Sequence, residues 1–170
     1  NAVSHIVAIN PLTEATFKAG TIGKLHSLNV NFPQALKPVA KLVSKVKVPS
    51  WAAAPGILPM LGVRGLLNGV FRDEDVQWNM QLPNEAKALV ELFLSLGDYA
   101  VLDNLVADNN YPSVCTIWGE QNSVLSAKAG RKLNVTLRPT REEYISDCGH
   151  LLMLEQPKIV TDIIRDFIKS

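Results

Sequence analysis

Apolar and β-favouring residues gather in three short runs that are separated by longer polar or mixed stretches. The runs cover residues 4–9, 114–118 and 143–146, and each has the length and composition of a β-strand. Residues 126–133 follow the second run with helical spacing, and a final amphipathic helix is predicted to begin near Glu155. The pattern therefore predicts an α/β unit in which three strands lie side by side as a parallel sheet.

The middle of the chain, residues 12–109, lacks strand-like alternation and is predicted to be a helical insertion. Prolines divide it into short pieces, and its clearest helix runs from an N-cap at Asn84 to Leu96. Residues 48–62 are almost entirely apolar, so they form either the wall of a substrate pocket or a face that packs against other protein or a membrane. Residues 62–69 lack the lysine of a phosphate loop and are predicted to be a flexible turn.

The charge of the chain is nearly balanced, with 17 Lys and Arg against 16 Asp and Glu and a net charge of +1. No nucleic-acid-binding module or basic patch with interleaved aromatic residues is evident, so we expect no nucleic-acid partner. Lys37, Lys41 and Lys45 follow one helical face, with Lys47 close behind. This stripe is interpreted as a solvated face, with contact to a membrane surface as the weaker alternative.

The composition is apolar for a solvated protein, with 47% hydrophobic residues and a mean hydropathy of +0.10. We therefore expect some faces to be covered by other protein. Cys115 and Cys148 lack the spacing of a metal site or a disulfide framework, which favours an intracellular, reducing compartment, the cytoplasm or an organelle. The sequence predicts neither a cofactor nor a metal site. No signal segment or run of about 20 apolar residues is seen, and we expect the chain to be a fragment or a processed product.

The strongest chemical signal is the Gly149-His150 pair, which an apolar run and Glu155-Gln156-Pro157 follow. A histidine on a short loop between a strand and a helix is held in place but remains reachable. Its ordinary pKa lies near neutral pH, which suits a general base. A second segment supports this interpretation, because the predicted strand at 114–118 ends in Trp118-Gly119 and leads through a turn into a helix.

This order of segments resembles the C-terminal half of the α/β-hydrolase superfamily. In that family a strand ending in W-G-x-x-D presents the acid of a catalytic triad, and a later G-H-x-x-x-x-E-x-P presents the histidine. The resemblance is specific over residues 111–170 and weaker over 3–11. It implies a C-terminal portion of a parallel hydrolase sheet with a helical cap insertion: a core strand in 1–11, a cap in 12–109, and the C-terminal core in 110–170.

The nucleophile of this family is missing from the chain. The G-x-S-x-G elbow, which strains a serine onto the top of the sheet, occurs nowhere in the 170 residues, and neither do its cysteine and aspartate equivalents. The family order of serine, acid and histidine places the elbow before Val3. We therefore expect the N-terminal half of the fold, from the same precursor or a companion chain, to be a partner that supplies the nucleophile and covers the sheet.

The acid of the triad is also altered, because the aspartate of the pattern falls on Asn122. An amide can orient an imidazole but cannot stabilise the imidazolium, and it can hold the wrong tautomer. Glu120 is an alternative acid if the turn is rearranged. Some branches of the family carry the acid after the earlier strand, which makes Asn10 and Glu14 candidates by location. A site without any working acid is a further alternative.

The leading hypothesis is part of a hydrolase that acts on a hydrophobic ester or thioester, with His150 as the general base and Glu155 and Pro157 in structural roles. By itself the chain is expected to be inactive. The competing hypothesis is a non-catalytic, hydrolase-like module that binds a hydrophobic ligand or a protein partner. A haloalkane- or epoxide-type hydrolase with an aspartate nucleophile is a third.

Overall fold

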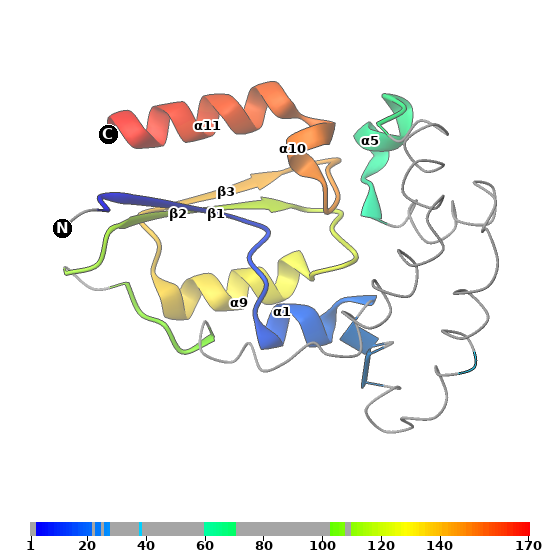
Figure 1. Ribbon diagram of the computed structural model, residues 1–170, viewed down its shortest axis with the longest axis horizontal. Coiled ribbons are helices and arrows are strands. Elements are labelled where there is room, and N and C mark those ends of the chain that lie inside the picture. Colours follow the sequence, from blue (N-terminus) through cyan, green and yellow to red (C-terminus); the bar gives the residue numbers. More distant parts are fainter. Residues whose placement is uncertain are drawn as a thin grey trace.

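The computed structural model describes residues 3–21, 23–24, 26–27, 38, 60–70, 103–107 and 110–170. These residues contain a sheet of three parallel strands, β1 (His5–Ile9), β2 (Ser113–Gly119) and β3 (Arg141–Ile145), in the order β1-β2-β3. Ile9 lies beside Ile117, and Gly119 beside Ile145. The predicted parallel sheet is confirmed, and all three strands point their carboxyl ends toward the same edge (Figure 1).

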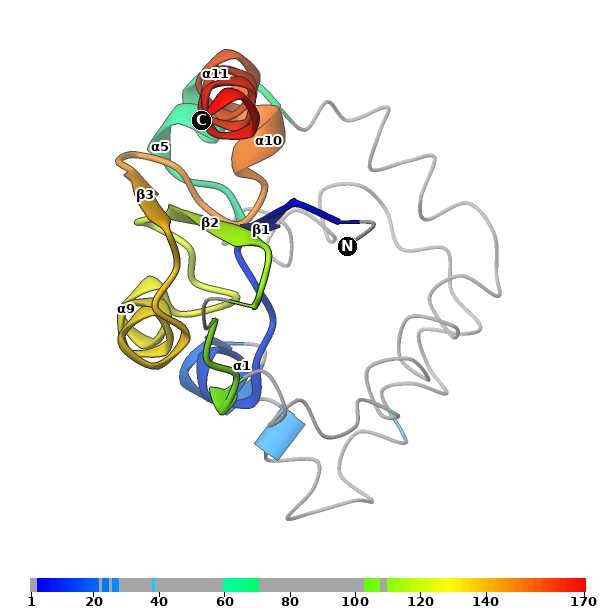
Figure 2. The same cartoon turned by 90° about the vertical axis from the view of Figure 1, so that its left-hand side faces the viewer.

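Helices cover both faces of this sheet, as a parallel sheet requires. Figure 2 shows α11 (Pro157–Lys169) over one face, and α9 (Ala127–Leu137) with α1 (Glu14–Ala19) over the other. Two short helices, α10 (Leu152–Glu155) and α5 (Val63–Leu67), contact each other beyond the carboxyl ends of the strands (Figure 1).

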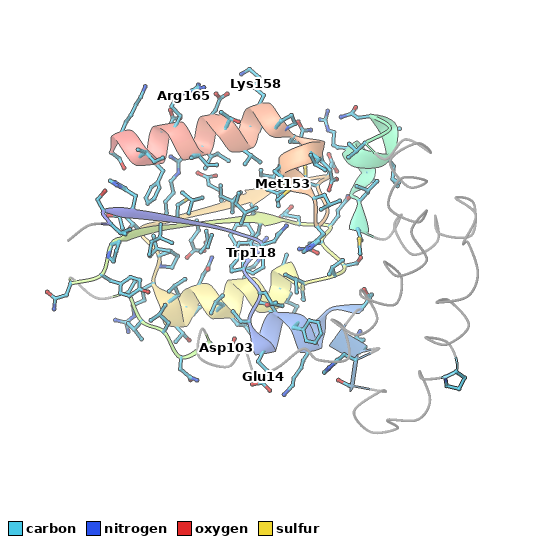
Figure 3. All side chains as sticks on the ribbon, in the orientation of Figure 1. Glu14, Asp103, Trp118, Met153, Lys158 and Arg165 are labelled. Carbon is cyan, nitrogen blue, oxygen red and sulfur yellow. The ribbon has the colours of Figure 1, made fainter. Side chains whose placement is uncertain are left out.

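Alternation along β2 separates the two layers of the core, because successive side chains of a strand point to opposite faces. Cys115 and Ile117 pack toward α11, whose apolar stripe consists of Val160, Ile163 and Phe167. Thr116 and Trp118 face α9 instead, where Thr116 bonds with Asn134 and the Trp118 ring lies against Gly130 (Figure 3). The strand is buried on both sides, which explains why its run of apolar residues is nearly continuous.

Helix α9 confirms the helix predicted after β2. Ser126 is its N-cap, and the hydroxyl of Ser126 accepts a hydrogen bond from the amide of Ala129 at 3.3 Å. The helix continues past the predicted end to Leu137 and stops at Arg138, which adopts a left-handed conformation with φ of 53°.

The final helix, predicted to begin near Glu155, is α11, which begins two residues later at Pro157, a position that needs no amide hydrogen, while the short helix α10 ends at Glu155. Two other local predictions were wrong. Strand β3 begins at Arg141 rather than Glu143, because an edge strand tolerates a charged pair such as Arg141 and Glu143, whose side chains lie 2.7 Å apart. Residues 63–67 form α5 rather than a flexible turn.

Only parts of the predicted cap at 12–109 belong to the described residues. Helix α1 packs alongside α9, whereas α5 contacts α10. The helix predicted from Asn84 to Leu96, the lysine stripe at 37–47 and residues 51–59 of the apolar stretch lie outside the described residues. The division of the chain into core and cap therefore stays a prediction. Within the described segments, no helix is long and apolar enough to cross a membrane.

Candidate active site

Three loops meet at the carboxyl edge of the sheet. Asn10 follows β1, residues 120–122 follow β2, and residues 146–150 follow β3. Because the strands are parallel and in register, these loops converge at one edge, the usual place for ligands in open α/β sheets. The amide of Gln121 donates to the carbonyl of Cys148 at 2.9 Å, so the second and third loops are bonded directly.

His150 lies on the third loop and is held by its own backbone. Its amide donates to the carbonyl of Met60 at 2.6 Å, and its carbonyl accepts from the side chain of Asn10 at 2.9 Å. The ring is partly buried, and its Nδ1 atom has no hydrogen-bond partner among the described residues. Burial lowers the pKa of His150, although the nearby Glu155 carboxylate opposes this shift. Burial of the ring therefore favours neutral imidazole over imidazolium, and a general base acts from the neutral form.

Glu155 fixes the same loop from the other side. Its carboxylate is 1% exposed and accepts hydrogen bonds from the amide of Gly149, at 2.9 and 3.1 Å, and from the amide of Gly62, at 2.7 Å. It thus ties the histidine loop to the start of α5. Sequence analysis expected Glu155 to have a structural role, and the contacts specify which segments it joins.

Close backbone approach at this edge depends on two glycines. A side chain at Gly119 would overlap the carbonyls of Cys148 and Gly149, and one at Gly149 would overlap the backbone of residues 60–62. These overlaps are with backbone atoms, which cannot rotate away as a side chain can. Glycine is therefore required where the turn after β2, the histidine loop and the start of α5 meet.

Asn10 connects the loops across the sheet. It is 5% exposed and adopts a left-handed conformation with φ of 43°, which asparagine tolerates better than most residues. Its Oδ1 atom accepts from the amide of Gly119 at 3.1 Å, while its Nδ2 atom donates to the carbonyls of His150, at 2.9 Å, and Gly149, at 3.4 Å. Sequence analysis named Asn10 only as a candidate acid. The signal for this clamp was an asparagine directly after an apolar strand and before Pro11.

Asn122, at the predicted acid position, is buried in the turn after β2. Its Oδ1 atom accepts from the amides of Val124 and Leu125, each at 3.0 Å, so the side chain closes its own turn. Its Nδ2 atom is buried and has no hydrogen-bond partner in the described part of the chain. No hydrogen bond joins Asn122 to His150 within the described residues.

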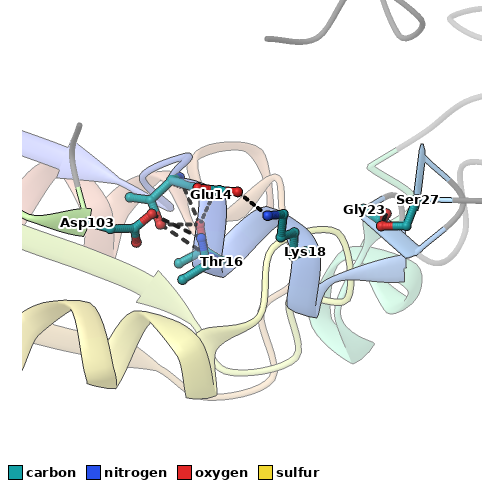
Figure 4. Close-up of polar contacts among 8 residues, drawn as sticks. Glu14, Thr16, Lys18, Gly23, Ser27 and Asp103 are labelled. Atoms are coloured by element: carbon teal, nitrogen blue, oxygen red, sulfur yellow. Dashed lines mark hydrogen bonds and ion pairs between the residues drawn. The ribbon is translucent and has the colours of Figure 1, made fainter. Parts of the chain in front are cut away.

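The two alternative acids lie in ion pairs with residues that do not belong to the histidine loop. Glu120 is exposed, and its carboxylate lies 2.6 Å from the guanidinium of Arg131, which also stacks on the Tyr144 ring. Glu14 begins α1 and pairs with Lys18 on the same helix (Figure 4). Among the described residues, neither carboxylate forms a hydrogen bond or an ion pair with His150, and their roles as acids stay predictions.

No cluster of side chains that could hold a metal ion occurs in the described segments. An apolar hollow of about 140 Å³ lies on the α9 side of the sheet. The hollow is lined mainly by β1, β2 and α9 side chains, among them Ile6, Ala8, Val114, Leu133 and Leu137. It does not include the histidine loop. Since β1 pairs only with β2 among the described strands, the hollow lies beside an open strand edge.

The layered sheet with its histidine loop defines a fold class, the α/β-hydrolase fold, which confirms the resemblance drawn from the sequence. An α/β hydrolase from a Medee basin deep-sea metagenome library superimposes with a TM-score of 0.68 at 18% identity, over 98% of this chain and 56% of that one. A thermophilic esterase from Thermogutta terrifontis gives a TM-score of 0.65 at 19% identity, over 97% of this chain and 55% of that one.

In sequence, the chain is similar to monoacylglycerol lipases. The chain is 22% identical to the monoacylglycerol lipase ABHD6 of Rattus norvegicus over 154 residues, which are 87% of this chain and 45% of that protein. No family model matches the chain. The chain thus spans about half the length of the relatives that it matches.

Proposed function

We propose that the chain is the C-terminal part of an α/β hydrolase that cleaves a hydrophobic ester or thioester, with His150 as the general base. One observation carries the proposal: His150 is partly buried at the carboxyl edge of the sheet, on a loop that Asn10, Glu155 and the Met60 carbonyl all hold. Such positioning on rigid elements is what a catalytic base needs.

In the proposed mechanism a serine from outside these 170 residues attacks the carbonyl carbon. His150 takes the serine proton at Nε2 and later gives it to the leaving group. Backbone amides near that serine stabilise the oxyanion. In the described part of the chain, the side chains of Asn10 and Glu155 hydrogen-bond only to backbone groups, which join the histidine loop to Gly119 and to Gly62, so both act as positioning residues.

The proposed partner is the N-terminal half of the fold. Two features of the described residues support it: the open edge of β1 and the apolar hollow beside that edge. Exposure of either to water is unfavourable, because an open edge leaves backbone groups unpaired and the hollow is lined by apolar side chains.

The two cysteines are free and buried, which supports the proposed reducing compartment.

The proposed substrate is apolar because of the surface beside the histidine loop. Helices α5 and α10 contact each other and expose large apolar side chains, namely Val63, Leu66, Leu67, Met153 and Leu154. Figure 3 labels Met153 among them. A cluster of this kind is typical of a ligand or interaction surface. The relative from Rattus norvegicus is named for a lipid ester, which supports the same substrate class.

A non-catalytic binding module is the second candidate, and Asn122 favours it. An amide at the acid position cannot stabilise the imidazolium that forms when a base accepts a proton. In this version the same apolar surface binds a ligand without cleaving it.

Labelling of the native protein with a serine-directed fluorophosphonate tests the proposal. We expect a labelled species whose intact mass includes sequence beyond these residues, and we expect His150→Ala to slow labelling by about 100-fold or more. His5→Ala is the matched control, because His5 lies at the amino end of β1, away from the site. Equal labelling rates in wild type and His150→Ala would contradict the proposed hydrolase. So would an absence of labelling in a protein that contains an elbow serine. Either result would favour the binding module.

A further inference from the structure

Four buried side-chain atoms in the described residues have no hydrogen-bond partner: Trp118 Nε1, Asn134 Oδ1, Asn122 Nδ2 and His150 Nδ1. Buried polar atoms are nearly always paired, so each needs an explanation. The first two belong to the packing of β2 against α9. The other two lie on the loops that follow β2 and β3, at the candidate active site.

The orientation of the Asn122 amide is fixed by its own turn. Two backbone N–H groups, of Val124 and Leu125, point at one atom of the amide, each at 3.0 Å. A flipped amide would place an NH₂ group against both donors, so the accepting atom is the oxygen. The nitrogen consequently faces away from the turn, into the protein interior.

The loop of Asn122 and the loop of His150 are bound to each other. Gln121 donates to the Cys148 carbonyl at 2.9 Å, and Asn10 bridges Gly119 to the His150 carbonyl. One loop thus carries a buried nitrogen that can only donate, and the other carries a buried ring nitrogen that can either donate or accept. The two atoms are chemically complementary.

We infer that the Asn122 amide donates a hydrogen bond to Nδ1 of His150 in the assembled site, and so holds the histidine as the tautomer with its proton on Nε2. The His150 ring adjusts to make this bond, because Asn122 is fixed by its turn. An aspartate at this position would do the opposite: it would accept a hydrogen bond from Nδ1–H and leave Nε2 without a proton, free to act as a base.

In the proposed hydrolase, the Nε2 atom of His150, which should accept the proton of the serine, would already carry a proton. An Nε2 atom that carries a proton cannot accept one from a serine, so the resting site is held in a form that binds ester but cleaves it slowly. This consequence rests on the proposed function, whereas the tautomer itself does not. Asn122 is therefore a positioning residue that sets the proton on His150.

Nitrogen-15 NMR of the histidine rings in the intact protein tests the inference, with His150→Gln to assign the signal. The wild-type His150 is expected to show a proton on Nε2 and a bare Nδ1. In Asn122→Asp we expect the proton to move to Nδ1 and the pKa of His150 to rise by about one unit or more, because a carboxylate replaces a neutral amide. Asn68→Asp, an equal charge change on an exposed residue, is expected to change neither.

A wild-type ring with its proton on Nδ1 overturns the inference, and this result needs no variant to fold. An unchanged tautomer in folded Asn122→Asp overturns it as well. Fluorophosphonate labelling separates the two proposals: a tautomer shift together with at least tenfold faster labelling supports both. A tautomer shift without labelling in either protein supports the role of Asn122 but contradicts the hydrolase.

Discussion

Removing the side chain of Asn10 should loosen the whole candidate site. In Asn10→Ala the amide of Gly119 and the carbonyls of His150 and Gly149 lose their partner. A buried backbone donor left without a partner costs about 1–3 kcal/mol, and each other lost bond costs about 1 kcal/mol. Alanine also carries about 1 kcal/mol of strain at the left-handed φ of 43°.

The sum predicts a loss of at least about 4 kcal/mol in the free energy of unfolding, with at least about 3 kcal/mol from the hydrogen bonds. Asn10→Gly separates the two contributions, because glycine removes the bonds without the strain. Its greater freedom in the unfolded state offsets much of that gain, so it should be more stable than the alanine variant by at most about 0.5 kcal/mol. Asn68→Ala, at an exposed residue with φ of −83°, should stay within about 0.5 kcal/mol of wild type.

Urea unfolding followed by circular dichroism measures these differences, and a thermal scan should show a fall of about 8–16 °C for Asn10→Ala. Fluorophosphonate labelling of the native protein should slow by at least about tenfold, because His150 loses a bond that holds its loop. An alanine variant within 1 kcal/mol of wild type, with unchanged labelling, would refute the role of Asn10 as a clamp.

Further predictions concern Glu155, Glu120 and the two buried thiols. Glu155→Gln should lower the free energy of unfolding by about 2 kcal/mol. In the wild type the carboxylate accepts hydrogen bonds from backbone amides, whereas the NH₂ group of glutamine cannot accept them and would face one of these donors. Glu120→Gln at an exposed ion pair should cost at most about 1 kcal/mol, and a complete loss of labelling in it would instead identify Glu120 as the acid. Burial raises the pKa of Cys148 to about 11 and also raises that of Cys115, so both native thiols should react with a disulfide reagent at pH 8 far more slowly than in urea. These protonated thiols stabilise the fold below pH 9, and that contribution should fall as the pH rises toward 11; fast labelling of the native protein at pH 8 would contradict their burial.

The strands and α9 could be predicted because their signals are local. The apolar run of β2 reflects burial on two faces, and Ser126 carries its own capping hydrogen bond at the start of α9. The edge strand and the end helices were less predictable, since their boundaries depend on neighbours. Arg141 joins β3 by pairing beside Cys115, a contact that no local pattern of residues 141–145 reveals.

Candidate site residues divide in the same way. His150 could be found from its motif, because a loop after a strand is visible in the sequence. The partners of that loop could not, since Asn10 is 140 positions away and meets the His150 carbonyl only after the sheet has formed. The same holds for Glu155, whose carboxylate reaches the amide of Gly62 across 93 positions.

Departures from ordinary backbone and burial preferences concentrate at one edge of the sheet. Two of the three non-glycine residues with positive φ in the described segments, Asn10 and Asp147, lie in its loops. Gly119, the last residue of β2, and Gly149 lie at the same edge, where a side chain would overlap backbone atoms, and the buried carboxylate of Glu155 bonds to the histidine loop there. Each such feature costs free energy locally, and a fold retains them together where geometry matters more than stability. The amino edge of the same strands has no comparable group in the described residues, so the asymmetry itself supports a functional site around His150.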